Sequence, residues 1–410
     1  MSRKKGGIDI VACLRDFNRG RDPGRLALKY RNMRADAFVF LRGTCHLYFD
    51  RVSQSGGLLD EAPNAWVCGD LHFENFGSYK GDNGLTYFDI NDFDEATLAP
   101  LSWDVGRFLS SLQVASKALR TTPAQTEALC TLFLDSYTAA LASGRIGWLE
   151  RETATGLIGE LLQQLESRRR SDFLDQHTWF KGKQRRIICD GKHAIAVSDD
   201  QRRKARELVE TSAAAKEKPD FFTVLDVVNR IAGTGSLGLE RFAVLVQGKG
   251  SPDRNALLDL KQVVGSSLQR HLGRPVPNWP SEAARIIALR QRMQCVPPRF
   301  LEAIPDGATS YVLRALQPVE DRVALGAARL SMRQMQGIII EMARLTAWAH
   351  LRGSGRGGSA IADELIAFAG DHARWREKLL AAATAAADQV NRDWATYAAA
   401  YDAGAFALDQ

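Results

Sequence analysis

The sequence predicts an α+β protein with two lobes, a mainly helical large lobe and a small lobe of antiparallel β strands. At 410 residues the chain is longer than one hydrophobic core usually holds. Apolar residues follow helical spacing from about 36 to 175 and again from about 325 onward, whereas short β-rich runs dominate between these stretches. The expected parts are a first stretch of the helical lobe at 1–178, a β-rich lobe at 179–320 and a second stretch of the helical lobe at 321–410.

Composition narrows the class of protein. Hydrophobic residues make up 45% and charged residues 25%, as in ordinary folded proteins, and no run approaches the roughly 18 apolar residues of a membrane-spanning helix. The apolar run at the basic start is short and broken by charge, which argues against a secretory signal. Six cysteines without paired spacing predict neither a zinc cluster nor a disulfide framework. We therefore expect a cytoplasmic protein that does not contact membranes.

The net charge of +6 allows an anionic partner. A nucleotide meets this condition as well as nucleic acid does, and the basic segments mix both signs of charge, which is typical of solvated helix faces. We therefore expect a nucleotide, rather than nucleic acid, as the partner. No sequence pattern predicts an oligomeric state.

Within the first helical stretch, one short β region gathers side chains that carry oxygen. "AWVCGD" is a short apolar strand that ends at Asp70, and Asn75 follows five positions later. The Asn-Gly pair at 83–84 then favours a tight hairpin turn, which returns the chain to its starting point. Asp92 and Asp94, which follow the hairpin, are therefore expected close to both.

This cluster of hard oxygen ligands suits magnesium. Phosphoryl transfer needs one carboxylate to orient an attacking hydroxyl and accept its proton, and an Asn and an Asp to hold metal on the phosphates. We assign Asp70 as the catalytic base, Asn75 and Asp92 as metal ligands, and Asp94 as a ligand of a second metal. The alternative is that these residues are turn formers that satisfy local backbone groups. It accounts well for the turn at 82–83 and poorly for an aspartate that ends a strand.

The β-rich lobe is expected to contain a hairpin and a glycine loop. "RRIICDGKHAIAVS" has β-rich arms around an Asp-Gly pair at 190–191, which predicts a hairpin, and "FFTVLDVVNRIAG", "ERFAVLVQG" and "ALLDLKQVV" are expected to be further strands. A GxGxxG pattern lies between the first two of these strands. Because a strand and not a helix follows the glycines, the pattern favours the phosphate-covering loop of a kinase over a dinucleotide fold. The expected nucleotide-binding residues of this loop are Gly233, Thr234, Gly235, Ser236 and Gly238.

Lys261 lies in an apolar strand after the glycine loop. With that loop upstream, we expect its ammonium group to contact the nucleotide phosphates. A solvated charge on an edge strand is the alternative. Glu282, in a following helix, is a candidate ion-pair partner of Lys261.

Three motifs resemble the aminoglycoside phosphotransferase and choline kinase group of protein-kinase-like enzymes. "GDLHFEN" resembles the catalytic loop of that group, and "NDFDEA" resembles its metal-binding segment. "WDVGRF" resembles the segment with a downstream structural aspartate, which implies that Asp104 braces the catalytic loop. Its spacing in the group favours Asp92 over Asp89 as the metal ligand. Cys68 stands where the group usually has histidine.

The order of these motifs differs from that of a kinase, in which the glycine loop and the lysine precede the catalytic aspartate. After the β-rich lobe, "SYVLRALQPVED" resembles a hinge, and "IIIEMARLTAWAHLRG" resembles the helix that follows the hinge in aminoglycoside phosphotransferases. The elements thus have the cyclic order of a kinase. We therefore predict a circularly permuted, two-lobed protein-kinase-like fold, with a coincidence of unrelated motifs as the alternative.

Nearly the whole chain also resembles a bacterial family catalogued as domain of unknown function 2252. The resemblance is carried by "KYRNMRADAFVFLRGTCHLYF", "CGDLHFENFGSYKG", "FDINDFDEA" and "GTGSLG". It implies relatedness and names no substrate.

These features together predict an ATP- and Mg²⁺-dependent phosphotransferase that moves a phosphoryl group to a hydroxyl of a small molecule. Three alternatives stay open. A metal-dependent phosphoesterase would use the Asp cluster with His72 and water, without the glycine loop or Lys261. A pseudokinase would bind ATP without turnover. Transfer of AMP would use the same ligands with the nucleotide reversed.

Overall fold

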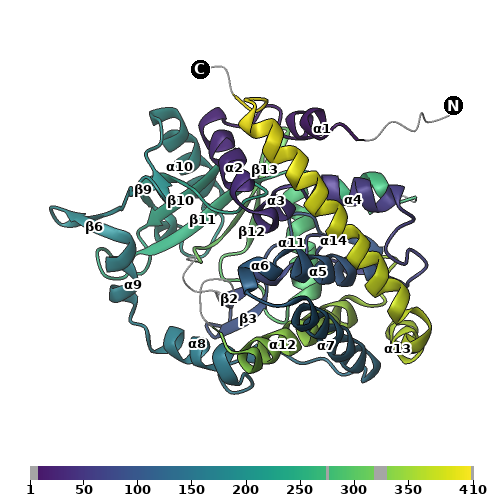
Figure 1. Cartoon of the computed structure of the whole chain (residues 1–410). Helices are drawn as coiled ribbons and strands as arrows, with labels where there is room; N and C mark the ends of the chain where they lie inside the picture. The colour runs from purple at the N-terminus through teal and green to yellow at the C-terminus, as the bar shows by residue number, and fades with distance from the viewer. Residues whose placement is uncertain (1–7, 274–276, 318–329, 408–410) are drawn as a thin grey trace.

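The computed structural model describes residues 8–273, 277–317 and 330–407 of the chain (Figure 1). Its architecture is α+β with antiparallel strand pairing in the described sheets, as the sequence predicts. A helical part holds both ends of the described chain, and a six-stranded sheet from the middle of the sequence lies beside it. Among the described helices, none combines the length and apolar character that crossing a bilayer would require.

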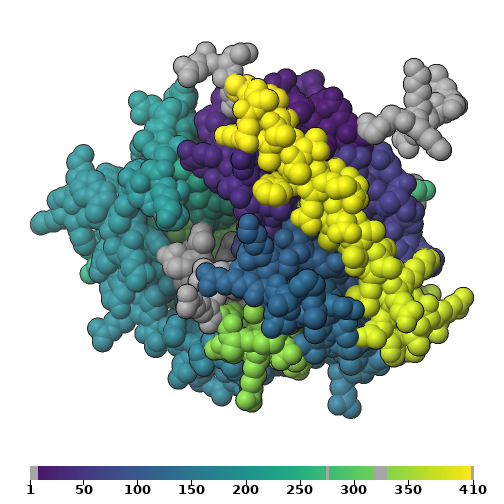
Figure 2. All heavy atoms as spheres, in the orientation of Figure 1, coloured from purple at the N-terminus to yellow at the C-terminus, as the bar shows by residue number. Residues whose placement is uncertain are grey.

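The helical part comes from two stretches of sequence that share one hydrophobic core. Its helices are α1 (Ile10–Phe17), α2 (Pro23–Ala35), α3 (Ala37–Gly43), α4 (Cys45–Gln54), α5 (Ser102–Val114), α6 (Ser116–Leu119), α7 (Pro123–Ala142), α12 (Met332–Gly353), α13 (Ala362–Gly370) and α14 (His372–Asp402). α12 packs along α7, while α14 packs on α5 and the N-terminal helices. Figure 2 shows α14, in yellow, running diagonally over these segments. The buried Ala383 and Ala387 let α14 approach its neighbours closely.

Two small sheets carry the acidic region. Their strands are β1 (Asn64–Val67), β2 (Phe76–Lys80), β3 (Thr86–Ile90), β4 (Thr97–Pro100) and β5 (Leu149–Glu150), in the orders β1-β4 and β2-β3-β5. The β2–β3 turn contains Gly84 at a φ of 88°, a left-handed conformation that glycine adopts readily. The predicted hairpin is therefore confirmed. It returns the chain to its start, where the N–H of Asn91 donates to the carbonyl of Asn75 at 2.8 Å.

The large sheet has the order β12-β13-β11-β10-β9-β8. Its strands are β8 (Ala194–Ile195), β9 (Val224–Arg230), β10 (Arg241–Val246), β11 (Ala256–Val263), β12 (Glu302–Asp306) and β13 (Thr309–Ala315). The three strands expected around and after the glycine loop are present as β9, β10 and β11. Because side chains alternate between faces, Leu258 and Leu260 pack with α10 (Asp199–Ala213) in a core on one face, and Asp259 and Lys261 lie on the other.

The remaining elements connect the sheet to the helical part. They are α8 (Gly156–Ser167), α9 (Arg170–His177), β6 (Thr178–Lys181), β7 (Gln184–Ile187), α11 (Glu282–Met293) and the 3₁₀ turns η1 (Phe73–Asn75), η2 (Pro219–Phe222) and η3 (Ser267–His271). α11 follows β11, yet its buried Ala283, Ile286 and Leu289 belong to the core of the helical part. The sheet and the helical part are therefore joined through α11.

The predicted pairing of the hairpin around residues 190–191 is wrong. The carboxylate of Asp190 accepts backbone N–H groups from residues 192 to 194, so a turn forms there as expected. Its arms, however, pair with other strands, β7 with β6 and β8 with β9. The N–H of Ile187 donates to the carboxylate of Asp226 at 2.9 Å, which ties the first arm to β9. A local turn signal fixes the turn and leaves the partner of each arm open.

The predicted boundary at residue 178 falls where α9 ends and β6 begins. The boundary at residue 320 lies outside the described residues, as do the last four residues of the segment that resembles a hinge. The described part of that segment is β13 without its first residue, followed by Leu316 and Gln317.

Candidate active site

The segment predicted to be a catalytic loop follows β1 and is held by Asp104 in the first turn of α5. The carboxylate of Asp104 accepts the backbone N–H groups of Cys68 and Gly69, each at 2.8 Å. Asp104 is fully buried, and Nε2 of His350 in α12 lies 3.3 Å from it. The bracing contact expected for Asp104 is therefore present, with a histidine from a distant helix as a further partner.

Asp70, the predicted catalytic base, forms an ion pair with Arg107. Nε of Arg107 donates to Oδ1 of Asp70 at 2.8 Å, and the fully buried guanidinium stacks over the ring of Tyr48 at 4.5 Å. Burial raises the pKa of Asp70, and the Arg107 charge opposes this rise. Arg107 lies in the motif "WDVGRF", but it was assigned no role from the sequence. Its spacing of three from Asp104, which places both on one face of α5, is a signal that could have found it.

Asn75 and Asp92 are held together through their backbones and side chains. Oδ1 of Asn75 accepts the N–H of Asp92 at 2.7 Å, and its Nδ2 donates to the carbonyls of Asp70 and Asp92 at 3.1 and 3.2 Å. The structure therefore brings these three predicted residues together at the base of the β2–β3 hairpin. Asp89, the alternative to Asp92, is buried within β3, where its Oδ1 accepts the N–H of Ile90 at 2.8 Å.

Lys261 reaches this cluster from the large sheet. Its Nζ forms an ion pair with Asp94 and lies 4.0 Å from Oδ1 of Asp92. Burial alone would raise the pKa of Asp92, but the Lys261 charge holds that pKa below its usual range. Glu282 is not the partner of Lys261 and pairs instead with Arg285, three positions further along α11, at 2.6 Å. The short spacing on one helix face explains this preference.

The donor set fits magnesium when phosphate oxygens complete it. Asn75 and Asp92 offer an amide and a carboxylate oxygen, and Mg²⁺ usually takes one or two carboxylates, substrate phosphates and waters. In the part of the chain that the structure describes, no group of three or more His, Cys, Asp or Glu side chains could hold a metal ion by itself. Asp94 is engaged by Lys261, so its predicted role as a second metal ligand would require that ion pair to open.

The glycine loop joins β9 to β10 and is held from outside by the N-terminal helical region. The carbonyl of Gly235 accepts from Nη1 of Arg21 at 2.7 Å and from Nζ of Lys29 at 3.0 Å. Arg25 donates to the carbonyl of Leu239 at 2.8 Å. No sequence motif connects these three basic residues with the loop, because more than 200 positions separate them from it.

A cavity of about 90 Å³ unites these segments. Its walls include nine of the ten predicted site residues, namely Asp70, Asn75, Asp92, Asp94, Gly233, Thr234, Gly235, Ser236 and Lys261. Gly238 lies outside it and lines an adjoining, more open cavity of about 650 Å³. Residues without a sequence signal also line the smaller cavity, among them Phe17, Arg42, Arg241 and Arg314.

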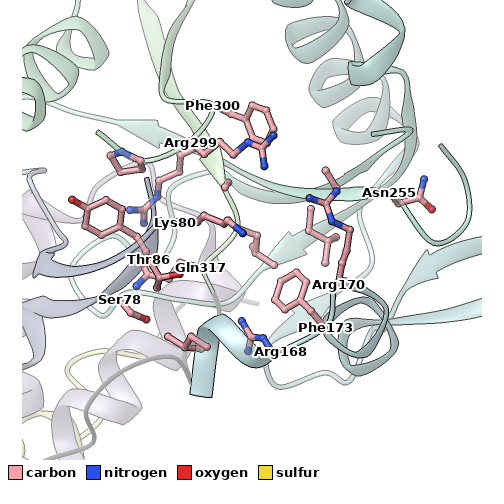
Figure 3. A pocket seen from close by; sticks show the side chains of 18 of the residues that line it. Ser78, Lys80, Thr86, Arg168, Arg170, Phe173, Asn255, Arg299, Phe300 and Gln317 are labelled. Carbon is pink, nitrogen blue, oxygen red and sulfur yellow. The ribbon is translucent and has the colours of Figure 1, made fainter. Parts of the chain in front are cut away.

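A second cavity, of about 260 Å³, lies on the other side of Arg314, which lines both (Figure 3). Figure 3 shows the side chain of Lys80 extending toward the middle of the view, with Arg170 and Phe173 of α9 approaching from the other side. Arg299 also lines this cavity, and no carboxylate is among its described lining residues. The sequence did not predict this basic cavity.

Comparisons with known proteins give one match. The model of a family described as "Uncharacterized protein conserved in bacteria (DUF2252)" matches residues 21–400, which include every residue of the site except Phe17. No curated protein and no solved structure matches the chain. Because the match covers nearly the whole chain, the protein belongs to the bacterial family DUF2252.

Proposed function

We propose that this protein is a kinase-like transferase that uses ATP and Mg²⁺ to modify a hydroxyl group of a small molecule. One observation carries the proposal. Lys261 lies 4.0 Å from Asp92 in a cavity that the glycine loop, Asp70 and Asn75 also line. Phosphoryl-group chemistry needs a lysine on the phosphates, oxygen ligands for metal and a carboxylate for the hydroxyl. If the acidic residues only formed turns, a lysine from a distant strand would not be expected beside them.

The order of the elements supports a circularly permuted kinase-like fold as part of this proposal. From β9 onward the chain runs through the glycine loop, β10, the lysine strand β11, the helix α11 and the strands β12 and β13. It then continues into the helical part, and the catalytic loop and the metal-binding segment come from the N-terminal half. Read cyclically, this is the order of a protein kinase.

Each side chain has a role in this proposal. Arg107 fixes one oxygen of Asp70, and Asp70 orients the acceptor hydroxyl and accepts its proton. Burial supports this role because it raises the pKa of Asp70 and makes the carboxylate a stronger base. Lys261 positions the phosphates. Asn75 and Asp92 would hold magnesium, which supplies charge neutralisation on the phosphates when bound.

Turnover of ATP by the purified protein tests the proposal. In the presence of Mg²⁺, Asp70→Asn should keep ATP binding and lose about 10²- to 10⁴-fold in turnover. Asp92→Ala should weaken Mg²⁺-dependent binding. Asp82→Ala, in the exposed hairpin turn, is the matched control and should behave like the unchanged protein.

Three results would contradict the proposal. Unchanged turnover in Asp70→Asn would remove the assigned base. Hydrolysis of a phosphomonoester without nucleotide, unaffected by Lys261→Met, would indicate a phosphoesterase. Binding of ATP without turnover, whether ATP is labelled at its α-phosphate or at its γ-phosphate, would indicate a pseudokinase.

A further inference from the structure

The second cavity, of about 260 Å³, carries an excess of positive charge. Four basic side chains line it that form no ion pair in the part of the chain that the structure describes, namely Lys80, Arg169, Arg170 and Arg299. Glu166 lies close enough to act on the charge of Lys80, but its carboxylate pairs with Arg151 at 3.0 Å. The four positive charges are therefore gathered at one cavity without a carboxylate of their own.

The cations lie close to one another, and the backbone holds two of them in place. Burial lowers the pKa of Lys80, and the charges of Arg299 and Arg170 lower that pKa further. The N–H of Arg299 donates to the carbonyl of Lys80 at 3.0 Å, and the carbonyl of Arg299 accepts from the N–H of Ala315 at 2.8 Å. An anion that accepts from several of these groups would relieve their mutual repulsion.

Gln317 supplies an independent sign of a ligand at the same cavity, which it lines (Figure 3). It is only 7% exposed, and neither Oε1 nor Nε2 of its side chain has a hydrogen-bond partner among the described residues. Its backbone is fixed, because its carbonyl accepts from Nη2 of Arg230 at 2.5 Å. A buried amide without partners costs free energy unless a bound molecule satisfies it.

Apolar side chains form another part of the wall, among them Phe173, Leu257 and Phe300. The ring of Phe300 packs against that of Phe221, with centroids 5.2 Å apart, and the guanidinium of Arg299 lies 4.7 Å from its centroid. Positive charge and apolar surface thus adjoin each other. A phosphate monoester carries about two negative charges and three acceptor oxygens, so one with an apolar group matches both features.

Arg314 stands between this cavity and the candidate active site and lines both. Its guanidinium is held by Oδ1 of Asn91 at 3.1 Å and by the carboxylate of Asp259 at 3.4 Å. In the proposed function, the phosphates of ATP lie at Lys261 in the smaller cavity, and the rest of the nucleotide carries no negative charge. The cations of the second cavity therefore match the anionic group of a different molecule.

We infer that the second cavity binds a small phosphate monoester with an apolar group, as a second ligand beside the nucleotide. Its phosphate lies among Lys80, Arg170 and Arg299, its apolar group packs against Phe173, and the amide of Gln317 bonds to its polar atoms. This inference rests on the proposed function, which places the phosphates of ATP in the smaller cavity.

Calorimetry with phenyl phosphate tests the site. The unchanged protein should bind this probe, and Arg299→Gln should weaken the binding at least about tenfold, because a charged hydrogen bond to phosphate is lost. Arg170→Gln, at an exposed residue where folding is not at risk, should weaken it several-fold. Arg374→Gln, which alters an exposed arginine of α14 that lines neither cavity, is the matched control. No binding of the probe, or equal affinities in all three variants, would overturn the inference.

Gln317→Leu separates a ligand-binding role from a structural one. Because it removes an unpartnered buried amide, it should raise the thermal midpoint of the free protein and still weaken phenyl phosphate binding. A lower midpoint with unchanged binding would contradict the inference.

Competition with Mg-ATP separates this inference from the proposed function. Phenyl phosphate should bind with unchanged stoichiometry when Mg-ATP is saturating, and Arg299→Gln should leave the affinity for Mg-ATP unchanged. If Mg-ATP displaces the probe and Arg299→Gln weakens both, the cations hold the phosphates of the nucleotide itself, which overturns the second ligand and leaves the transferase intact. If the protein binds phenyl phosphate at Arg299 but no ATP, the proposed function fails and the phosphate site stands.

Discussion

Arg107 is the residue on which the behaviour of Asp70 depends most directly. Its guanidinium is fully buried between the ring of Tyr48 and the carboxylate, and it also donates to the carbonyl of Leu41 at 3.0 Å. A buried cation with this many partners keeps one orientation. It therefore sets both the position and the proton affinity of the proposed base.

Replacing this charge should alter the pH dependence of turnover. Arg107→Met removes the charge that opposes the raised pKa of Asp70, so that pKa should rise further. Because the base acts deprotonated, the acidic limb of the pH profile of ATP turnover should move up by about one unit or more. Arg107→Lys, which keeps the charge, is the control and should move it less. If the acidic limb did not move in Arg107→Met, Asp70 would not be the group whose titration sets that limb.

Asp89 should make the protein less stable as pH rises. Burial raises the pKa of this carboxyl to about 6 from its ordinary value of 3.8. A raised pKa in the folded state means that the stability is fully present at low pH and is lost between these two values. Asp89→Asn lacks this loss, so its stability relative to the unchanged protein should improve by about 2 to 3 kcal/mol from about pH 4 to pH 7. Urea unfolding at several pH values measures this, and parallel curves for the two proteins would contradict it.

The loop after β1 illustrates how one element is fixed by another. Gly69 has a φ of 82°, and a Cβ atom there would lie 2.4 Å from the backbone carbonyl oxygen of Glu95. Gly84, in the β2–β3 turn, has a similar φ but open space around it. A comparison of alanine at Gly69 and at Gly84 therefore separates the cost of the left-handed backbone from the cost of the steric contact.

Alanine at these two positions should have unequal effects. Gly84→Ala should cost about 1 to 2 kcal/mol of stability, from the left-handed conformation alone. Gly69→Ala should cost about 1 to 3 kcal/mol more, since the backbone of residue 95 must move. Chemical denaturation of both variants measures the difference. Equal losses would show that the loop yields to the added methyl group.

Elements with a local signal could be predicted from the sequence. The strands β9 to β11 and the hairpin around Gly84 were expected from apolar runs and turn residues, and the structure confirms them. The pairing around residues 190–191 was not, because Ile187 bonds to Asp226 far along the chain. Asp94, the ion-pair partner of Lys261, was also missed, because 167 positions separate the two residues in the sequence.

The arginines of the site had no such signal. Arg241 and Arg314 are single basic residues in β strands, which elsewhere are solvated charges. They form a cluster around Asp259, and this carboxylate lies beside them only because β11 pairs with β10 and β13. A charge cluster of this kind follows from the register of three strands and not from a motif.

At the scale of the whole molecule, the N-terminal helices connect the helical part to the glycine loop. Lys29 is fully buried and bridges Oδ1 of Asn18, at 2.9 Å, to the carbonyl of Gly235. The loop is therefore held by a part of the chain that is not in the sheet. The conformation of the glycine loop should depend on this side chain.

Lys29→Met keeps the length of the side chain and removes the bridge. The Kd for Mg-ATP should rise up to about tenfold, because the hydrogen bond from this buried amine to the loop is lost. The exposed Lys117→Met is the control and should leave the Kd unchanged. Titration of both variants with ATP measures the effect, and equal affinities would mean that the loop does not need this support.

The position of α14 also bears on how the protein is made. This helix packs on α2, α3, α4 and α5, and its Tyr397 donates to the carbonyl of Tyr30 at 2.8 Å. A ribosome makes α14 after the loop that follows β1 and the strand β11 that carries Lys261. The early helices α2, α3 and α4 therefore have no cover from α14 while the middle of the chain is being made, and a chain that stopped before α14 would leave the faces that this helix covers open to solvent.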